Sequence, residues 1–127
     1  MKEITVKTAG RTHFCEITSK VAAATRALGV ENGVITVFVP HTTAGVTINE
    51  NADPDVVADM DMILDRIIPW EASYRHMEGN SASHVKASMM GSSAQVIVRD
   101  GQLQLGTWQG IYLCEFDGPR TRKVWIQ

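Results

Sequence analysis

The fold is decided by the strand-rich C-terminal stretch Gln95–Ile126, QVIVRDGQLQLGTWQGIYLCEFDGPRTRKVWI. Its first half contains the turn sequence Arg99-Asp100-Gly101, which is typical of a tight hairpin. Its second half is interrupted by Asp117-Gly118-Pro119-Arg120. Between these turns, four segments rich in β-branched and aromatic residues predict strands: Gln95–Val98, Gln102–Leu105, Gly110–Phe116 and Arg122–Ile126. Short strands joined by such turns favour an antiparallel sheet.

The rest of the chain adds strands and helices in alternation. Further strands are predicted at Glu3–Thr8, Thr12–Ile17, Val34–Val39 and Val46–Ile48. One helix begins at Thr18 or Ser19 and ends before Gly29, a second runs from the N-cap Asp53 to Pro69, and a short third runs through Val85–Met90. The pattern predicts one α+β domain over residues 1–127, with seven or so mostly antiparallel strands and two or three helices.

The second helix carries the clearest apolar periodicity. Its hydrophobic residues recur at threes and fours and predict one buried stripe: Val56, Val57, Met60, Ile63, Leu64 and Ile67. Asp61 lies at the edge of this stripe, where it belongs either to a solvated face or to the border of a cleft. Trp108 lies between glycines and is predicted to pack in the core or at a subunit interface.

Composition excludes several classes of function. Of the 127 residues, 44% are hydrophobic and 20% are charged, as in ordinary globular proteins. The formal charge of -2 gives no broad basic field for nucleic acid. No apolar run approaches the roughly 20 residues that span a bilayer, and the first residues do not resemble a signal peptide, so we expect a cytoplasmic protein. In that compartment Cys15 and Cys114 are expected to be core thiols, with a disulfide as the alternative.

Three of the four histidines lie in compact polar segments. His41 follows the end of a predicted strand in Pro40–Gly45, and His76 and His84 flank a loop containing Glu78, Gly79 and Asn80. Histidine is suited both to metal ligation and to proton transfer near neutral pH. His84 is also placed in the first turn of a helix, near free N–H groups that favour anions. If the three segments converge, we expect a chemical site.

Other polar segments have two interpretations each. Thr42 and Thr43 either contact a phosphate or metal or satisfy the backbone of a turn. Asn49 and Glu50 leave a strand together and have oxygen ligands of the kind that suits Mg²⁺. Arg120 follows Pro119 and is either a phosphate clamp or a solvated edge charge.

Several of these blocks, in this order, resemble the YjbQ family, some of whose members are described as secondary thiamine-phosphate synthases. The resemblance covers nearly the whole chain and rests on the following segments: His41–Ala44, Asn49–Val56, Tyr74–Asn80, His84, Met90–Ser93, Gly106–Gln109 and Phe116–Arg120. It implies a small α+β domain with its strands in a two-sheet sandwich, assembled as a homotrimer. It also implies a pocket that holds His41, Asn80 and His84 with neighbouring acids near a subunit boundary.

The activity that the resemblance implies joins a hydroxymethylpyrimidine diphosphate to a thiazole phosphate and releases diphosphate, and it is regarded as weak or secondary. We therefore hypothesise a phosphate-ester-handling enzyme, with His41, His84 and Glu50 as catalytic groups. Substrate or phosphate would be bound by Thr42, Thr43, Asn49, Asn80 and Arg120, and a divalent ion, Mg²⁺ or Zn²⁺, by His41, His76, His84 and Asp61. The alternatives are a non-catalytic module that binds a phosphorylated metabolite and a metal-dependent hydrolase of another substrate.

Overall fold

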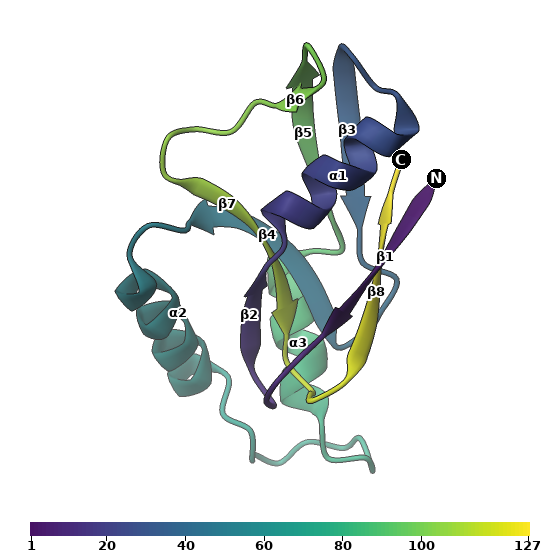
Figure 1. The fold of residues 1–127 in the computed structure, drawn as a ribbon. Helices are drawn as coiled ribbons and strands as arrows, with labels where there is room; N and C mark the ends of the chain where they lie inside the picture. Colours follow the sequence, from purple (N-terminus) through teal and green to yellow (C-terminus); the bar gives the residue numbers. More distant parts are fainter.

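The computed structural model describes residues 1–127, which form eight strands and three helices (Figure 1). In chain order these are β1 (Lys2–Lys7), β2 (His13–Glu16), α1 (Thr18–Leu28), β3 (Gly33–Phe38), β4 (Ala44–Glu50), α2 (Pro54–Ile67), α3 (Ser81–Met90), β5 (Ser93–Arg99), β6 (Gln102–Leu103), β7 (Gln109–Glu115) and β8 (Thr121–Ile126). Every strand pairing is antiparallel. The α+β class with three helices is confirmed.

The strands form two sheets. A five-stranded sheet has the order β1-β8-β3-β5-β6, and a three-stranded sheet has the order β2-β7-β4. One apolar cluster contains residues from both sheets and from α1, among them Val21, Ile35, Val46, Leu113 and Val124, each no more than 1% exposed. Burial of each such side chain stabilises the fold by roughly 1.5–3 kcal/mol. The alternation of buried and exposed residues along β8 and β3 fixes the register of the larger sheet.

Strands that follow one another along the chain are placed in different sheets at one end of the molecule. β1 pairs with β8, whereas β2 pairs with β7, so neither β1–β2 nor β7–β8 is a hairpin. The two connections instead bond to each other: the Thr8 N–H donates to Arg120 O at 2.8 Å, and the Gly118 N–H donates to Arg11 O at 3.0 Å. This end of the molecule is where the long α2–α3 loop also passes (Figure 1).

The caps of the first two helices explain where they begin and end. α1 ends at Gly29, whose φ of 73° is the left-handed conformation that glycine adopts without strain. α2 begins after Asp53, whose carboxylate accepts from the Asp55 N–H at 2.9 Å, with Pro54 in the first turn. The predicted end of α1 at Gly29 and the predicted start of α2 at Asp53 are confirmed. None of the three helices is both long and apolar enough to cross a membrane.

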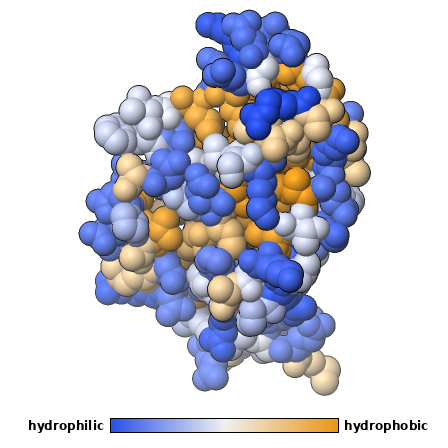
Figure 2. Space-filling model, viewed as in Figure 1, coloured by the Kyte–Doolittle hydropathy of each residue, from blue (hydrophilic) through white to orange (hydrophobic).

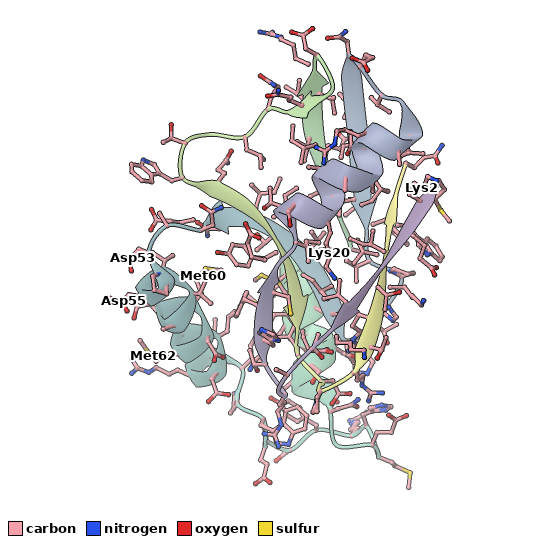
Figure 3. The ribbon with its side chains drawn as sticks, in the orientation of Figure 1. Lys2, Lys20, Asp53, Asp55, Met60 and Met62 are labelled. Atoms are coloured by element: carbon pink, nitrogen blue, oxygen red, sulfur yellow. The ribbon has the colours of Figure 1, made fainter.

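The predicted buried stripe of α2 is wrong in part. Leu64 is the one buried residue of this helix, whereas Ile63 is 50% exposed and Ile67 is 59% exposed. Figure 3 shows Met60 on the side of α2 that faces the sheets and Met62 on the side that faces away. The helix stands beside the body of the chain, as Figure 1 also shows, so only a narrow part of its apolar surface is covered.

Trp108 does not pack in the core, since 63% of it is exposed on the loop before β7. Cys15 and Cys114 are buried and free, as expected for core thiols, and burial raises their pKa values to about 11 and about 12. In Figure 2 hydrophobic surface lies in the upper part of the molecule, whereas the lower end is mostly hydrophilic. That hydrophilic end includes the long loop between α2 and α3.

Candidate functional site

A polar pocket of about 620 Å³ lies where the three histidine segments meet. Its wall comes from the end of β3 and the β3–β4 connection, the α2–α3 loop, the start of α3, the α3–β5 connection, the β7–β8 connection and β8. Only Phe38 and Val39 among its lining residues are hydrophobic; the others include His41, Thr42, Thr43, His76, Glu78, Asn80, His84, Asp117, Arg120 and Arg122. The convergence predicted from the sequence is therefore confirmed.

His41 is held against the start of β8. The Lys123 backbone N–H donates to His41 Nε2 at 2.9 Å, and the ring is partly buried. Burial lowers the pKa of His41 below its ordinary value of 6.5, and the positive charge of Arg122 acts in the same direction. The imidazole is therefore neutral at pH 7.

A buried ion pair joins Arg122, which lines the pocket, to Glu115, which does not. Arg122 donates to Glu115 through Nε at 2.9 Å and through Nη2, and Nη2 also donates to Thr43 Oγ1 at 2.7 Å. Desolvation raises the pKa of Glu115, but hydrogen bonds from Arg122, Thr8 and the Asp117 N–H outweigh it, and the net pKa is below 4.5. The carboxylate is therefore charged at pH 7. Nη1 of Arg122 makes no hydrogen bond within the chain, and Arg122 is one of the residues that line the pocket.

Asn80 is the N-cap of α3, but its side chain makes no capping hydrogen bond. Its Nδ2 instead donates to Asp117 Oδ2 at 2.9 Å. Asn80 is only 7% exposed, and its Oδ1 is the one buried side-chain polar atom without a hydrogen-bond partner. Since a buried acceptor without a donor costs about 1–3 kcal/mol, this atom marks a place where a bound group would be stabilising.

His76 and His84 form the outer part of the pocket. Their rings meet edge to face, with centroids 5.4 Å apart. His76 lies on the turn closed by the Gly79 N–H donating to its carbonyl at 3.1 Å, and Gly79 has a φ of 74°. Glu78, on the same turn, lies 3.9 Å from His76 Nε2. Two imidazoles and a carboxylate at the mouth are suited to proton transfer.

The charges of the pocket are largely paired. Arg120 donates to Asp117 Oδ2 at 3.0 Å and to the Asp117 carbonyl at 2.7 Å, and its side chain is 52% exposed. Arg122 is paired with Glu115. An anion in this pocket would thus depend on directed donors and on the positive N-terminal end of α3 more than on net charge.

Three of the residues proposed from sequence are not brought into the pocket. Asn49 and Glu50 belong to the far end of β4, where Asn49 Nδ2 lies 3.5 Å from Met60 Sδ and the Glu50 carbonyl accepts from Tyr112 at 2.9 Å. Asp61 lies on α2. None of the three lines the pocket, because β4 continues to Glu50 and carries its last residues away from His41.

Sequence reasoning gave no role to Arg122, Glu115 or Asp117. The signal for the first two was present. Arg122 shares a face of β8 with Val124 and Ile126, and Glu115 lies in the continuously apolar segment Gly110–Phe116. Charged residues at such positions must be buried, and buried charges are paired.

The four residues proposed as metal ligands do not assemble into a metal site within one chain. Asp61 is outside the pocket, and His41 Nε2 is engaged by Lys123. No group of three or more His, Cys, Asp or Glu side chains is arranged to hold an ion. The donor set of a single chain does not fit a Zn²⁺ site of three or four protein ligands.

The sequence and the fold recur in known proteins. The chain is 52% identical to the UPF0047 protein YugU of Bacillus subtilis over all of its length and 97% of the relative, and 45% identical to a UPF0047 protein of Methanocaldococcus jannaschii over 96% of the chain and 88% of the relative. A crystal structure from Clostridium acetobutylicum, described as an uncharacterized conserved protein, matches with a TM-score of 0.97 and 54% identity, covering 100% of this chain and 98% of that one.

A conserved hypothetical protein from Thermus thermophilus matches with a TM-score of 0.93 and 41% identity, covering 100% of this chain and 98% of that one. The family model described as UPF0047 protein YjbQ-like matches residues 2–127. The resemblance drawn from the polar blocks is therefore confirmed: the chain belongs to the YjbQ-like (UPF0047) family.

Proposed function

We propose that this protein is an enzyme that binds a small phosphorylated metabolite in the pocket and acts at its phosphate ester. The observation that carries the proposal is the meeting of three imidazoles with Arg122 in one polar pocket. The buried guanidinium is rigidly held by Glu115 and Thr43, and it keeps one amino group free to bind an oxyanion. A held donor needs no reorganisation when charge develops, which is the condition for stabilising a transition state.

The reaction that we propose is the one implied by the family, in which diphosphate is displaced from a hydroxymethylpyrimidine diphosphate by a thiazole phosphate. The thiazole nitrogen forms a C–N bond to the methylene carbon of the pyrimidine as the C–O bond to diphosphate breaks, so negative charge builds on the departing diphosphate. Arg122, the positive end of α3 and Thr42 would stabilise that charge. The attacking nitrogen carries no proton, so the role of His84 or His76 would be to donate a proton to the departing diphosphate.

A divalent ion, Mg²⁺ or Zn²⁺, stays a proposal. Because one chain offers no complete ligand set, an ion would need phosphate oxygens of the ligand, which Mg²⁺ commonly uses, or donors from a second subunit. No step of the proposed reaction depends on it.

We also propose that the chain assembles as a homotrimer, as the resemblance implies. Val34 and Ile97 are register partners on the five-stranded sheet and are 56% and 61% exposed. On the same sheet Phe38 stacks on Trp125 with centroids 5.7 Å apart, and Phe38 also lines the pocket. Apolar surface that continues into a pocket wall suits a second copy of the chain. Light scattering should give three times the chain mass, and a monomer mass would contradict the assembly.

Turnover of the proposed substrates tests the enzyme hypothesis. Wild-type protein and His84→Ala are incubated with hydroxymethylpyrimidine diphosphate and thiazole phosphate, and released diphosphate is measured. We expect release by the wild type and a loss of roughly 10²–10⁴-fold in the variant, as for removal of an acid–base group. Binding is followed by calorimetry in parallel.

The same pair of measurements separates the alternatives. Tight binding of a phosphorylated ligand without turnover by the wild type would favour a binding module over an enzyme. Release of phosphate or diphosphate that depends on an added ion and does not require the thiazole phosphate would favour a metal-dependent hydrolase. If the wild type neither bound these ligands nor turned them over, the result would contradict the proposed function.

A further inference from the structure

We infer that His41 is a fixed hydrogen-bond donor to the oxyanion of the ligand, with its tautomer set by the backbone of β8, and is neither a general base nor a metal ligand. The oxyanion is the phosphate of the proposed function, on which this inference rests.

The first step is the contact between His41 Nε2 and the Lys123 N–H, at 2.9 Å. A backbone N–H can only donate, so Nε2 must carry the lone pair. Lys123 lies opposite Thr5 in the register of β1 and β8, which fixes the direction of this donor. In a neutral imidazole with its lone pair on Nε2, the proton is on Nδ1.

The second step is that the ring stays neutral. Protonation of Nε2 would set two N–H groups against each other across the contact with Lys123. Burial and the charge of Arg122 lower the pKa of His41 as well. The charged groups that affect the pKa of the ring are Arg122, Arg120 and Glu115, and the negative charge of Glu115 is balanced by its ion pair with Arg122.

The third step is that Nδ1 has no partner within the chain. It makes no hydrogen bond within the chain and is not among the enclosed atoms without partners. The His41 residue lines the polar pocket with Arg122, and it also lines an adjoining hollow; Thr42 and His84 line both. The Nδ1 N–H is therefore free for a ligand. Nη1 of Arg122 also has no acceptor within the chain, and donors without acceptors on two residues of one pocket suit an oxyanion.

The consequence is a division of roles among the histidines. To bind a metal or take a proton through Nδ1, His41 would need its proton on Nε2, which would break the bond to Lys123. His84 and His76 have no such backbone donor on their rings, so acid–base chemistry falls to them.

The experiment has two arms. Side-chain ¹⁵N NMR of the full-length wild type reports the tautomer of each histidine, and we expect His41 to be the Nδ1–H form at neutral pH. Diphosphate binding by calorimetry is then compared for His41→Asn and His41→Gln. An asparagine amide places its nitrogen near the position of Nδ1, whereas a glutamine amide reaches the position of Nε2.

We expect His41→Gln to bind diphosphate roughly 10-fold or more weakly than His41→Asn, as for loss of a hydrogen bond to a charged group. An Nε2–H form or an averaged mixture in the wild type would overturn the inference, as would equal or reversed affinities of the two variants. The tautomer is measured without ligand. If the wild type does not bind diphosphate, that result counts against the proposed function. The His41 tautomer is still decided by the NMR spectrum of the wild type, which does not require the variants to fold.

Discussion

Two polar regions of this chain look alike in sequence and differ in structure. The pocket end gathers His41, His84 and Arg122 around one cavity, backed by a buried ion pair. The far end of β4, with Asn49 and Glu50, presents its polar groups singly, next to an exposed Trp108. The difference teaches that polar residues at strand ends form a site only where the topology brings several connections together, as it does where β1–β2 and β7–β8 cross between sheets.

The largest expected effect is on the stability of the pocket end. Arg122→Met leaves Glu115 buried without its partner, and we expect a loss of about 3–5 kcal/mol in the free energy of unfolding. Arg120→Met is the matched control, since this half-exposed arginine pairs with Asp117 and should cost less than about 1 kcal/mol. Urea denaturation measures both. Equal losses would show that the buried pair does not anchor the pocket end.

The pH dependence of stability sharpens the same comparison. The pKa of Glu115 is lowered by folding, so its stabilising contribution is complete above its unfolded pKa of about 4.5 and is lost as the pH falls through the lower folded pKa. Glu115→Gln should therefore be less stable than the wild type by roughly 1–3 kcal/mol at pH 7. The gap should narrow in acid, and a gap that is constant with pH would contradict the assignment of a charged Glu115.

At the other end, the N-cap of α2 offers a purely structural contrast. Asp53→Ala removes the bond to the Asp55 N–H and should cost about 1 kcal/mol of unfolding free energy. Diphosphate affinity, measured by calorimetry, should not change, because α2 does not line the pocket. A weakened affinity would mean that α2 supports the site through contacts that one chain does not show.

The smallest expected effect is that of Glu50→Gln. Its side chain makes no hydrogen bond or ion pair and lies outside the pocket, so stability should change by less than about 0.5 kcal/mol and turnover should be unaltered. Steady-state kinetics provide the check. A clear loss of turnover would revive the role proposed from sequence and would place Glu50 at the pocket of a neighbouring subunit.

Much of the fold could be read from the sequence because its signals are local. Gly29 ends α1, Asp53 and Pro54 begin α2, and Arg99-Asp100-Gly101 turns β5 into β6. The strand partners could not be predicted, because the paired residues of β1 and β8 are 114 to 124 positions apart, from Lys7 with Thr121 to Lys2 with Ile126. No local sequence pattern indicates so distant a partner. The exposure of the apolar residues of α2 was not predicted for a related reason. Periodicity shows which face of a helix is apolar, but it does not show whether another part of the chain covers that face.

The site was predicted in part. His41, His76, His84 and Asn80 were singled out by their polar surroundings and do converge. Glu50 and Asp61 carry the same kind of chemistry but lie elsewhere, which only the tertiary structure decides. The orientation of Asn80, set by Asp117, depends on a hydrogen bond across 37 positions and has no signature in the sequence.

The most direct test of a phosphate-binding pocket is an NMR titration of the wild-type protein with diphosphate. Binding where the three imidazoles meet predicts that side-chain signals of His41, His84 and Arg122 move together along one saturable curve, while signals of Glu50 and Asp61 stay in place. Signals that stay in place throughout, or that move around Glu50 and Asp61 instead, would contradict it.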